Sequence, residues 1–222
     1  MPQLVGLFNG FGGGASALVA GAELVDRFDA AGPGATLPAD VTGAAAVAGL
    51  VGAVTFWGSL VAAGKLQGVL EGPIRYSGQH AVKAALFVVA VLAGAYLVVQ
   101  PGLLGPAPLG GWVPTYWFLV LAASVLGVAL VVPIGGADMP VVIALLNAYS
   151  GLAAATTGFV LDNSVLVIAG TLVGASGMIL TLVMCRSMNR SLSNVLFGGF
   201  GDAPASGDDD GTDVYEGRVK ST

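Results

Sequence analysis

The chain has 222 residues, of which 55% are hydrophobic and only 9% are charged, with a formal net charge of −5. A soluble domain usually carries about a quarter charged residues, so this composition excludes a water-soluble globular protein and indicates one whose main solvent is a lipid bilayer. The single cysteine, Cys185, excludes an internal disulfide and a cysteine-rich metal site.

Apolar stretches long enough to cross a bilayer recur along the chain, since a hydrocarbon core needs roughly 20 apolar residues in helical form. The sequence therefore predicts an all-α fold, a polytopic transmembrane bundle of about six helices. The predicted spans are residues 3–22, 43–64, 81–100, 113–134, 139–161 and 164–186. Residues 1–190 are predicted to form the transmembrane domain, and the acidic residues 191–222 a flexible linker or tail.

The segments between the spans predict an orientation. Residues 23–41 form a net acidic connection, whereas residues 65–80 and 186–190 hold basic side chains. The positive-inside rule places basic segments in the cytoplasm, so we expect a multi-pass protein of the cell membrane with both termini cytoplasmic. His80, the only histidine, is expected to be solvated at the start of the third span. Trp112, Tyr116 and Trp117 are predicted to lie in an interfacial aromatic belt.

The first and fifth spans share a pattern that indicates a parallel internal repeat. Residues 1–20 and 139–158 both begin with Met-Pro and share a leucine, an asparagine, a glycine and an alanine at the same spacing. The helices that follow align loosely, residues 52–61 with residues 174–183. Transport proteins often contain such repeats, with the pathway between the copies. Chance similarity between helices rich in glycine and alanine is the alternative.

Polar side chains within the spans are the candidates for function, because each costs free energy unless it has a partner or a task. Asn9 and Asn147 lie in mid-helix, where they either support a hydrogen-bonded water chain for protons or form interhelical bonds that only fix packing. Asp138 precedes a helix that begins Met-Pro, and its alternative interpretation is a helix N-cap. Four hydroxyl groups are further candidates, although each can instead bond to the backbone of its own helix. They belong to Thr55, Ser59, Ser176 and Thr181.

Residues 10–15 read Gly-Phe-Gly-Gly-Gly-Ala and match the dinucleotide-binding fingerprint. That fingerprint requires a preceding strand in a βαβ unit, whereas a helix is predicted here. We therefore expect no nucleotide site in this chain. We also expect no catalytic residue, no bound cofactor or metal and no nucleic-acid partner.

Other stretches cover much of the chain and carry a family resemblance. They are 52–66 (GAVTFWGSLVAAGKL), 135–142 (GGADMPVV), 146–151 (LNAYSG), 174–177 (GASG), 184–191 (MCRSMNRS) and 198–201 (GGFG). In order and spacing they resemble the membrane domain of the β subunit of proton-translocating NAD(P) transhydrogenases.

The resemblance implies a Re/Si-specific enzyme complex in which proton entry drives hydride transfer from NADH to NADP⁺. NAD(H) and NADP(H) are then bound by other domains or chains. By match of motif, Asn147 and Asp138 fall on the proton path and its coupling, and Ser176 and Gly177 in a tightly packed helix of that path. We expect protons to pass along Asn147, hydroxyls and ordered water between the second, fifth and sixth spans. The hinge to the NADP(H) domain is matched by Arg186, Arg190, Gly198, Gly199 and Gly201.

The chain departs from the family pattern in three places. The family's β subunit usually starts with additional helices, which another chain would supply here. The NADP(H)-binding domain that the family places after the acidic tail is expected to be either a separate chain or removed from this one. Many members use a proton-carrying histidine, whereas residues 38–42, before the second span, contain none and offer Asp40 as a substitute beside a histidine of another subunit. The expected partners are the bilayer, an NAD(H)-binding α subunit, the chain with the missing helices and the NADP(H)-binding domain, in a dimeric complex.

Two other functions are considered. The repeat alone suggests a small secondary transporter, which should carry a substrate-binding cluster near the middle of the membrane. A purely structural membrane subunit would tolerate apolar residues at both Asn9 and Asn147.

Overall fold

The computed structural model describes residues 1–32, 36–70, 72, 74, 77–99, 112–189 and 191–197, apart from the side chains of 112, 196 and 197. Within these ranges the chain is helical and contains no strand, which confirms the predicted all-α fold. The six long helices are each long and apolar enough to cross a membrane. They are α1 (Pro2–Ala31), α2 (Ala39–Leu66), α3 (Gln79–Val99), α5 (Trp112–Val131), α6 (Met139–Val160) and α7 (Ser164–Ser187). A 3-10 turn, η1 (Gly136–Asp138), precedes α6, and the short helix α8 (Leu192–Phe197) follows α7.

Helix α1 is longer than predicted, because it continues past residue 22 to Ala31. Its additional turns are supported by Leu24, which is buried, and by an ion pair at 2.8 Å between Glu23 and Arg27 one turn apart. The helix ends at Gly32, whose φ of 83° suits glycine. The predicted connection over residues 23–41 is therefore wrong in its first half, and its last three residues belong to α2. The other five spans match to within about one helical turn.

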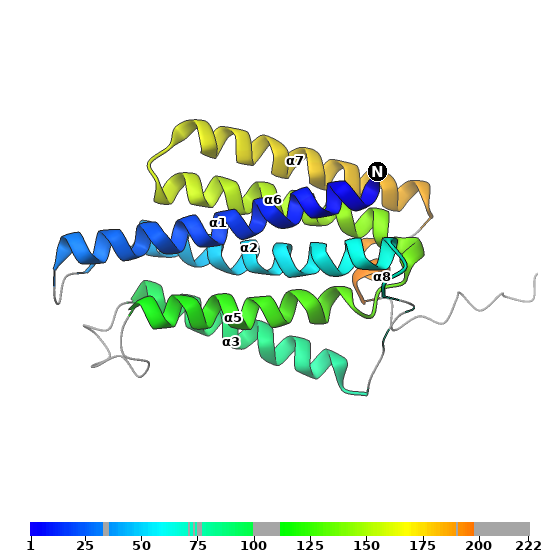
Figure 1. Ribbon diagram of the computed structural model, residues 1–222, viewed down its shortest axis with the longest axis horizontal. Coiled ribbons are helices and arrows are strands. Elements are labelled where there is room, and N and C mark those ends of the chain that lie inside the picture. Colours follow the sequence, from blue (N-terminus) through cyan, green and yellow to red (C-terminus); the bar gives the residue numbers. More distant parts are fainter. Residues whose placement is uncertain are drawn as a thin grey trace, which may run out of the picture.

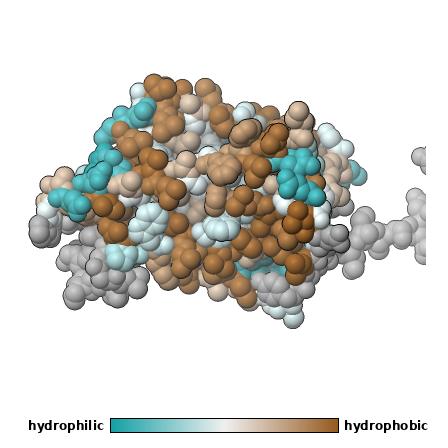
Figure 2. All heavy atoms as spheres, viewed as in Figure 1, coloured by the Kyte–Doolittle hydropathy of each residue, from teal (hydrophilic) through white to brown (hydrophobic). Residues whose placement is uncertain are grey.

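The long helices run side by side, with the α6–α7 pair and the α3–α5 pair on opposite sides of α1 and α2 (Figure 1). Helix α2 contacts α1, α3, α5 and α6, whereas α7 packs extensively on α6 alone among the long helices. The visible side of the bundle is mostly hydrophobic, and hydrophilic side chains gather mainly toward its two ends (Figure 2). This distribution fits a bundle that stands across a bilayer.

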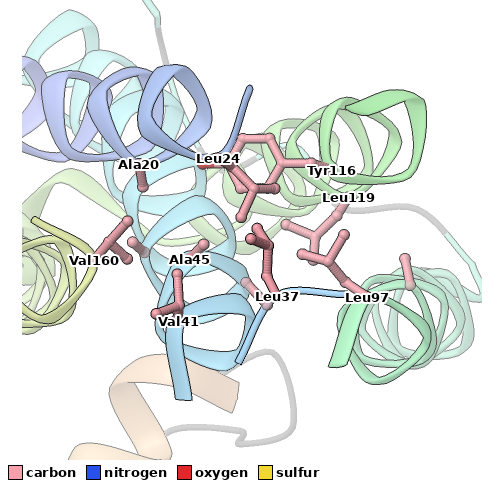
Figure 3. Packing of buried hydrophobic residues seen from close by; sticks show 12 residues of the cluster. Ala20, Leu24, Leu37, Val41, Ala45, Leu97, Tyr116, Leu119 and Val160 are labelled. Atoms are coloured by element: carbon pink, nitrogen blue, oxygen red, sulfur yellow. The ribbon is translucent and has the colours of Figure 1, made fainter. Parts of the chain in front are cut away.

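Two main apolar clusters lie at opposite ends of the bundle. One surrounds Leu24, Leu37 and Tyr116, where α1 ends and α2 begins (Figure 3). The other includes Ile134 and Met139 at the start of α6, where α8 also packs. The small helix after α7 is thus part of the folded bundle. Residues 198–222 of the predicted tail lie outside the described residues.

Glycines at matching positions of the repeat bring each helix pair into backbone contact. A Cβ atom added to Gly52 would lie 2.5 Å from the carbonyl oxygen of Gly13. In the second copy, a Cβ added to Gly170 would lie 2.7 Å from the carbonyl oxygen of Gly151, which is the repeat counterpart of Gly13. The two hairpins therefore pack in the same way, and this supports the predicted repeat.

The same contacts correct the alignment of the second helices. Gly52 also touches Ala17, and Gly170 touches Ala155, the counterpart of Ala17 in the repeat. Gly52 therefore corresponds to Gly170, not to Gly174 as the loose sequence alignment has it. Gly/Ala-rich helices can be shifted by one turn without changing their apolar pattern, so only the contacts fix the register.

Candidate functional site

The predicted asparagines are linked through the backbone of α6. Asn9 on α1 is 7% exposed, and its Nδ2 donates a hydrogen bond of 3.2 Å to the carbonyl oxygen of Ile143 on α6. That carbonyl lies four residues before Asn147, so within the helix it also accepts the backbone N–H of Asn147. A polar connection thus runs from the side chain of Asn9 to the helical turn that carries Asn147.

The side chain of Asn147 lies against α7, on Gly177. A Cβ added to Gly177 would lie 3.0 Å from Nδ2 of Asn147 and 2.6 Å from the backbone nitrogen of Ala148. Any larger residue at position 177 would therefore push α6 and α7 apart at the height of the Asn147 amide. The structure brings these two predicted site residues together.

The hydroxyl groups mostly bond to their own helices. Thr55 donates to Val51 at 2.6 Å, and Thr181 donates to Gly177 at 2.8 Å. Ser176 is exposed on α7 and donates to Val173 at 2.9 Å, so its side chain lies on a face of α7 that does not contact α6. The Ser59 hydroxyl differs: it is fully buried on α2, close to Gly10, and finds no hydrogen-bond partner in the described part of the chain.

Helix α6 separates the two groups of candidates. Thr55 and Ser59 lie where α2 meets α1, whereas Asn147 lies where α6 meets α7. The second, fifth and sixth spans therefore do not surround a single space within the described residues. A polar connection across the bundle passes instead through Asn9 and the Ile143 carbonyl.

The predicted acidic candidates lie at opposite ends of the bundle. Asp138 ends η1 and occupies the N-cap position of α6, although its carboxylate does not accept the capping hydrogen bond. Asp40 is exposed in the first turn of α2, where its Oδ1 accepts a 3.0 Å bond from the backbone nitrogen of Val41. Arg186 lies exposed in the last turn of α7, at the same end as Asp138. The other hinge candidates, Arg190, Gly198, Gly199 and Gly201, lie outside the described residues.

The Gly-x-Gly-x-x-Ala match is helical throughout. Residues 10–15 lie inside α1, and Gly13 and Gly14 contact α2. These glycines serve close helix packing, and the strand–turn–helix geometry of the fingerprint is not formed there.

Tyr116 is a polar residue whose place the sequence did not predict. It was expected in an interfacial belt, but it is 1% exposed and its hydroxyl donates a 2.5 Å bond to the carbonyl oxygen of Ala17. Gly21 and Gly49 make room for it, since a Cβ on either would lie within 3.0 Å of its side chain. Trp117, in contrast, is exposed as predicted.

Two further polar contacts were also missed. Thr157 on α6 donates to the carbonyl oxygen of Ser16 on α1 at 3.3 Å, in addition to its own helix. Lys65, at the end of α2, donates to backbone carbonyls that follow α5. The available signal for Lys65 was that it is the only basic residue of α2 and lies in the last turn of that helix.

Comparisons with known proteins give a consistent result. The family model described as NAD(P) transhydrogenase beta subunit matches residues 1–222. Two curated relatives from Rhodospirillum rubrum, one of them from a named strain, are both called NAD(P) transhydrogenase subunit beta. Each is 44% identical over 203 residues, covering 90% of this chain and 42% of the relative. The chain therefore spans about two fifths of the length of the curated relatives it matches.

Proposed function

Because this chain belongs to the NAD(P) transhydrogenase beta subunit family, we propose that it is the membrane part of a Re/Si-specific, proton-translocating NAD(P)⁺ transhydrogenase. In this proposal the chain conducts protons and couples them to hydride transfer between NAD(H) and NADP(H). Both nucleotides bind to other domains or chains, and this chain holds no nucleotide site.

The observation that carries the proposal is the polar connection between Asn9 and the turn of Asn147 inside an apolar bundle. Buried polar side chains in a membrane protein are costly, and they are common along proton and ion pathways. Ser59 adds a fully buried hydroxyl on α2 that has no hydrogen-bond partner among the described residues, and it could bond to a water on the path. The proposed path uses Asn9, Asn147, Ser59, Thr55 and ordered water.

The proposed coupling begins at Asp138. This residue lies at the start of α6, at the end of the bundle where α8 packs. Residues after α8 match the family's hinge. We therefore propose that a change of charge near Asp138 is transmitted to the NADP(H) domain through α8 and this hinge. Asp40 lies at the far end, where protons would enter from outside the cell.

The proposed assembly follows from the family and the charge distribution. Its partners are an NAD(H)-binding α subunit, a chain that supplies the remaining helices and an NADP(H)-binding domain, in a dimer of the complex. Basic residues gather at the end of the bundle that carries the N-terminus and Arg186, which supports cytoplasmic termini in the plasma membrane.

The proposal is tested by replacing Asn147 with leucine in the assembled complex. We expect Asn147→Leu to abolish the stimulation of NADPH formation by a proton gradient, because leucine offers no hydrogen bond, while the complex still assembles. Thr171→Val is the matched control, since Thr171 is exposed on α7 and its hydroxyl donates to Val167 of its own helix at 2.7 Å. Full gradient stimulation in Asn147→Leu would refute a role of this residue in the path.

A secondary transporter is the less favoured alternative. Transporters usually hold a substrate cluster at mid-membrane, whereas the charged residues of the described helices lie near helix ends. The family match also points away from this alternative.

A further inference from the structure

Lys65 connects the end of α2 to the segment that follows α5. Its Nζ donates hydrogen bonds to the carbonyl oxygens of Val132 and Ile134, the latter at 2.7 Å. The last carbonyl groups of a helix lack partners within the helix and carry the negative end of its dipole. A lysine ammonium is therefore well suited to this position, and its charge-assisted bonds are roughly twice as strong as neutral ones.

The segment after α5 is packed against the bundle at both of its ends. Ile134 and Met139 are buried in the apolar cluster at this end of the bundle. Between them, a Cβ added to Gly135 or Gly136 would meet no atom within 4 Å, and Ala137 is exposed. The turn that carries Asp138 is thus packed at Ile134 and Met139, and it is closed by the 3.1 Å bond from the Asp138 backbone N–H to the Gly135 carbonyl oxygen.

We propose that Lys65 is a positioning residue, which fixes the η1 turn and thereby Asp138 by capping the carbonyl groups of Val132 and Ile134. The inference rests on the proposed function, in which Asp138 takes part in coupling. Val195 of α8 is buried in the same cluster as Ile134 and Met139. In this proposal a displacement of the turn is passed to α8 through that cluster.

A simpler role for Lys65 is that of a long side chain that reaches the membrane surface. Lysines near helix ends often do so, with the ammonium in water. In that case replacing Lys65 would change neither the mobility of the η1 turn nor the coupling. Lys83 is a comparable lysine at the same end, half-buried in the first turns of α3 and without a hydrogen bond in the described part of the chain, so it serves as the control.

The experiment compares Lys65→Gln, Lys65→Arg and Lys83→Gln in the full complex. Each carries a nitroxide spin label on Ala137→Cys, with Cys185→Ala so that only one thiol of this chain is labelled. We expect Lys65→Gln to increase label mobility and to reduce gradient-driven NADPH formation about tenfold, the effect of losing a charged hydrogen bond. Lys65→Arg, which keeps a cationic donor, and Lys83→Gln should retain the restricted spectrum and the coupling.

The outcomes separate the two proposals. If Lys65→Gln leaves the Ala137 spectrum unchanged, or only lowers the amount of folded protein without altering coupling per molecule, the positioning role is refuted. If the protein with Lys65 intact shows no response to the gradient, the proposed function fails instead. The spin-label spectra then still report whether Lys65 holds the turn.

Discussion

Single polar residues in this bundle differ in whether they bond to their own helix or to another. Thr55, Thr181 and Ser176 return their hydroxyls to the helix that carries them. Asn9 instead bonds to a carbonyl on α6, over a separation of 134 residues. The amide of an asparagine needs a hydrogen-bond partner inside the membrane, and for Asn9 that partner lies on another helix.

Replacing Asn9 with leucine should weaken the bundle only modestly. The Ile143 carbonyl keeps its bond to the backbone of Asn147, so no buried group is left without a partner. Hydrogen bonds between membrane helices contribute about 0.6 kcal/mol on average. We expect Asn9→Leu to lower the thermal stability of the detergent-solubilised protein by about that amount, with gradient-driven activity impaired more strongly. Loss of the folded protein would show that the bond is chiefly structural.

The helix pairs are held together by glycines that allow backbone contact. In α6 and α7 these contacts involve Gly151, Gly170 and Gly177. Apolar burial adds little between helices surrounded by lipid, so close packing of small residues provides much of the association energy. This explains how α7 stays in place although it packs extensively on α6 alone among the long helices.

A methyl group added to Gly151 should therefore be strongly unfavourable. Its Cβ would collide with the backbone of both Gly170 and Gly174, and backbone atoms cannot move aside as a side chain can. We expect Gly151→Ala to cost about 1–3 kcal/mol of stability, measured by thermal unfolding in detergent.

Gly43→Ala on α2 is the matched control for the Gly151 variant. A Cβ there would only touch Val98 at 3.7 Å, an ordinary contact. Alanine favours the helix, so we expect a gain of about 0.5–1 kcal/mol. Equal effects of the two substitutions would contradict the role of backbone contact at Gly151.

The number and approximate bounds of the membrane-spanning helices could be predicted from the sequence, because bilayer thickness sets the length of apolar stretch that a span needs. The extension of α1 could not, since four of residues 23–31 are charged and their helix depends on Leu24 and the Arg27 contacts. The burial of Tyr116 depends on glycines of two other helices, α1 and α2. The repeat pointed to both Asn9 and Asn147, but which helix each amide faces is a property of the packed bundle.

At the scale of the whole molecule, charge is distributed unequally between the two ends. One end holds Arg27 among acidic residues, and Arg27 is bound to Glu23 at 2.8 Å and to Asp162 at 3.1 Å. The other end holds Lys65, Lys83 and Arg186. By the positive-inside rule, this second end is expected to face the cytoplasm.

This orientation is tested with a membrane-impermeant maleimide. Ala137→Cys should react in inside-out vesicles and not in intact cells, whereas Ala30→Cys should react in intact cells. Both alanines are exposed, and the natural Cys185 is buried, so background labelling should be low. The reverse pattern would place the Asp138 end of the bundle outside the cell.

The central claim is that this chain couples a proton gradient to hydride transfer, and it is tested most directly in energised membrane vesicles. NADPH formation from NADH and NADP⁺ is measured with the candidate partner subunits present, with and without this chain, before and after an uncoupler is added. We predict that the gradient stimulates NADPH formation only when the chain is present, and that the uncoupler removes this stimulation. The claim is contradicted if NADPH formation responds to the gradient equally without the chain, or does not respond to it at all.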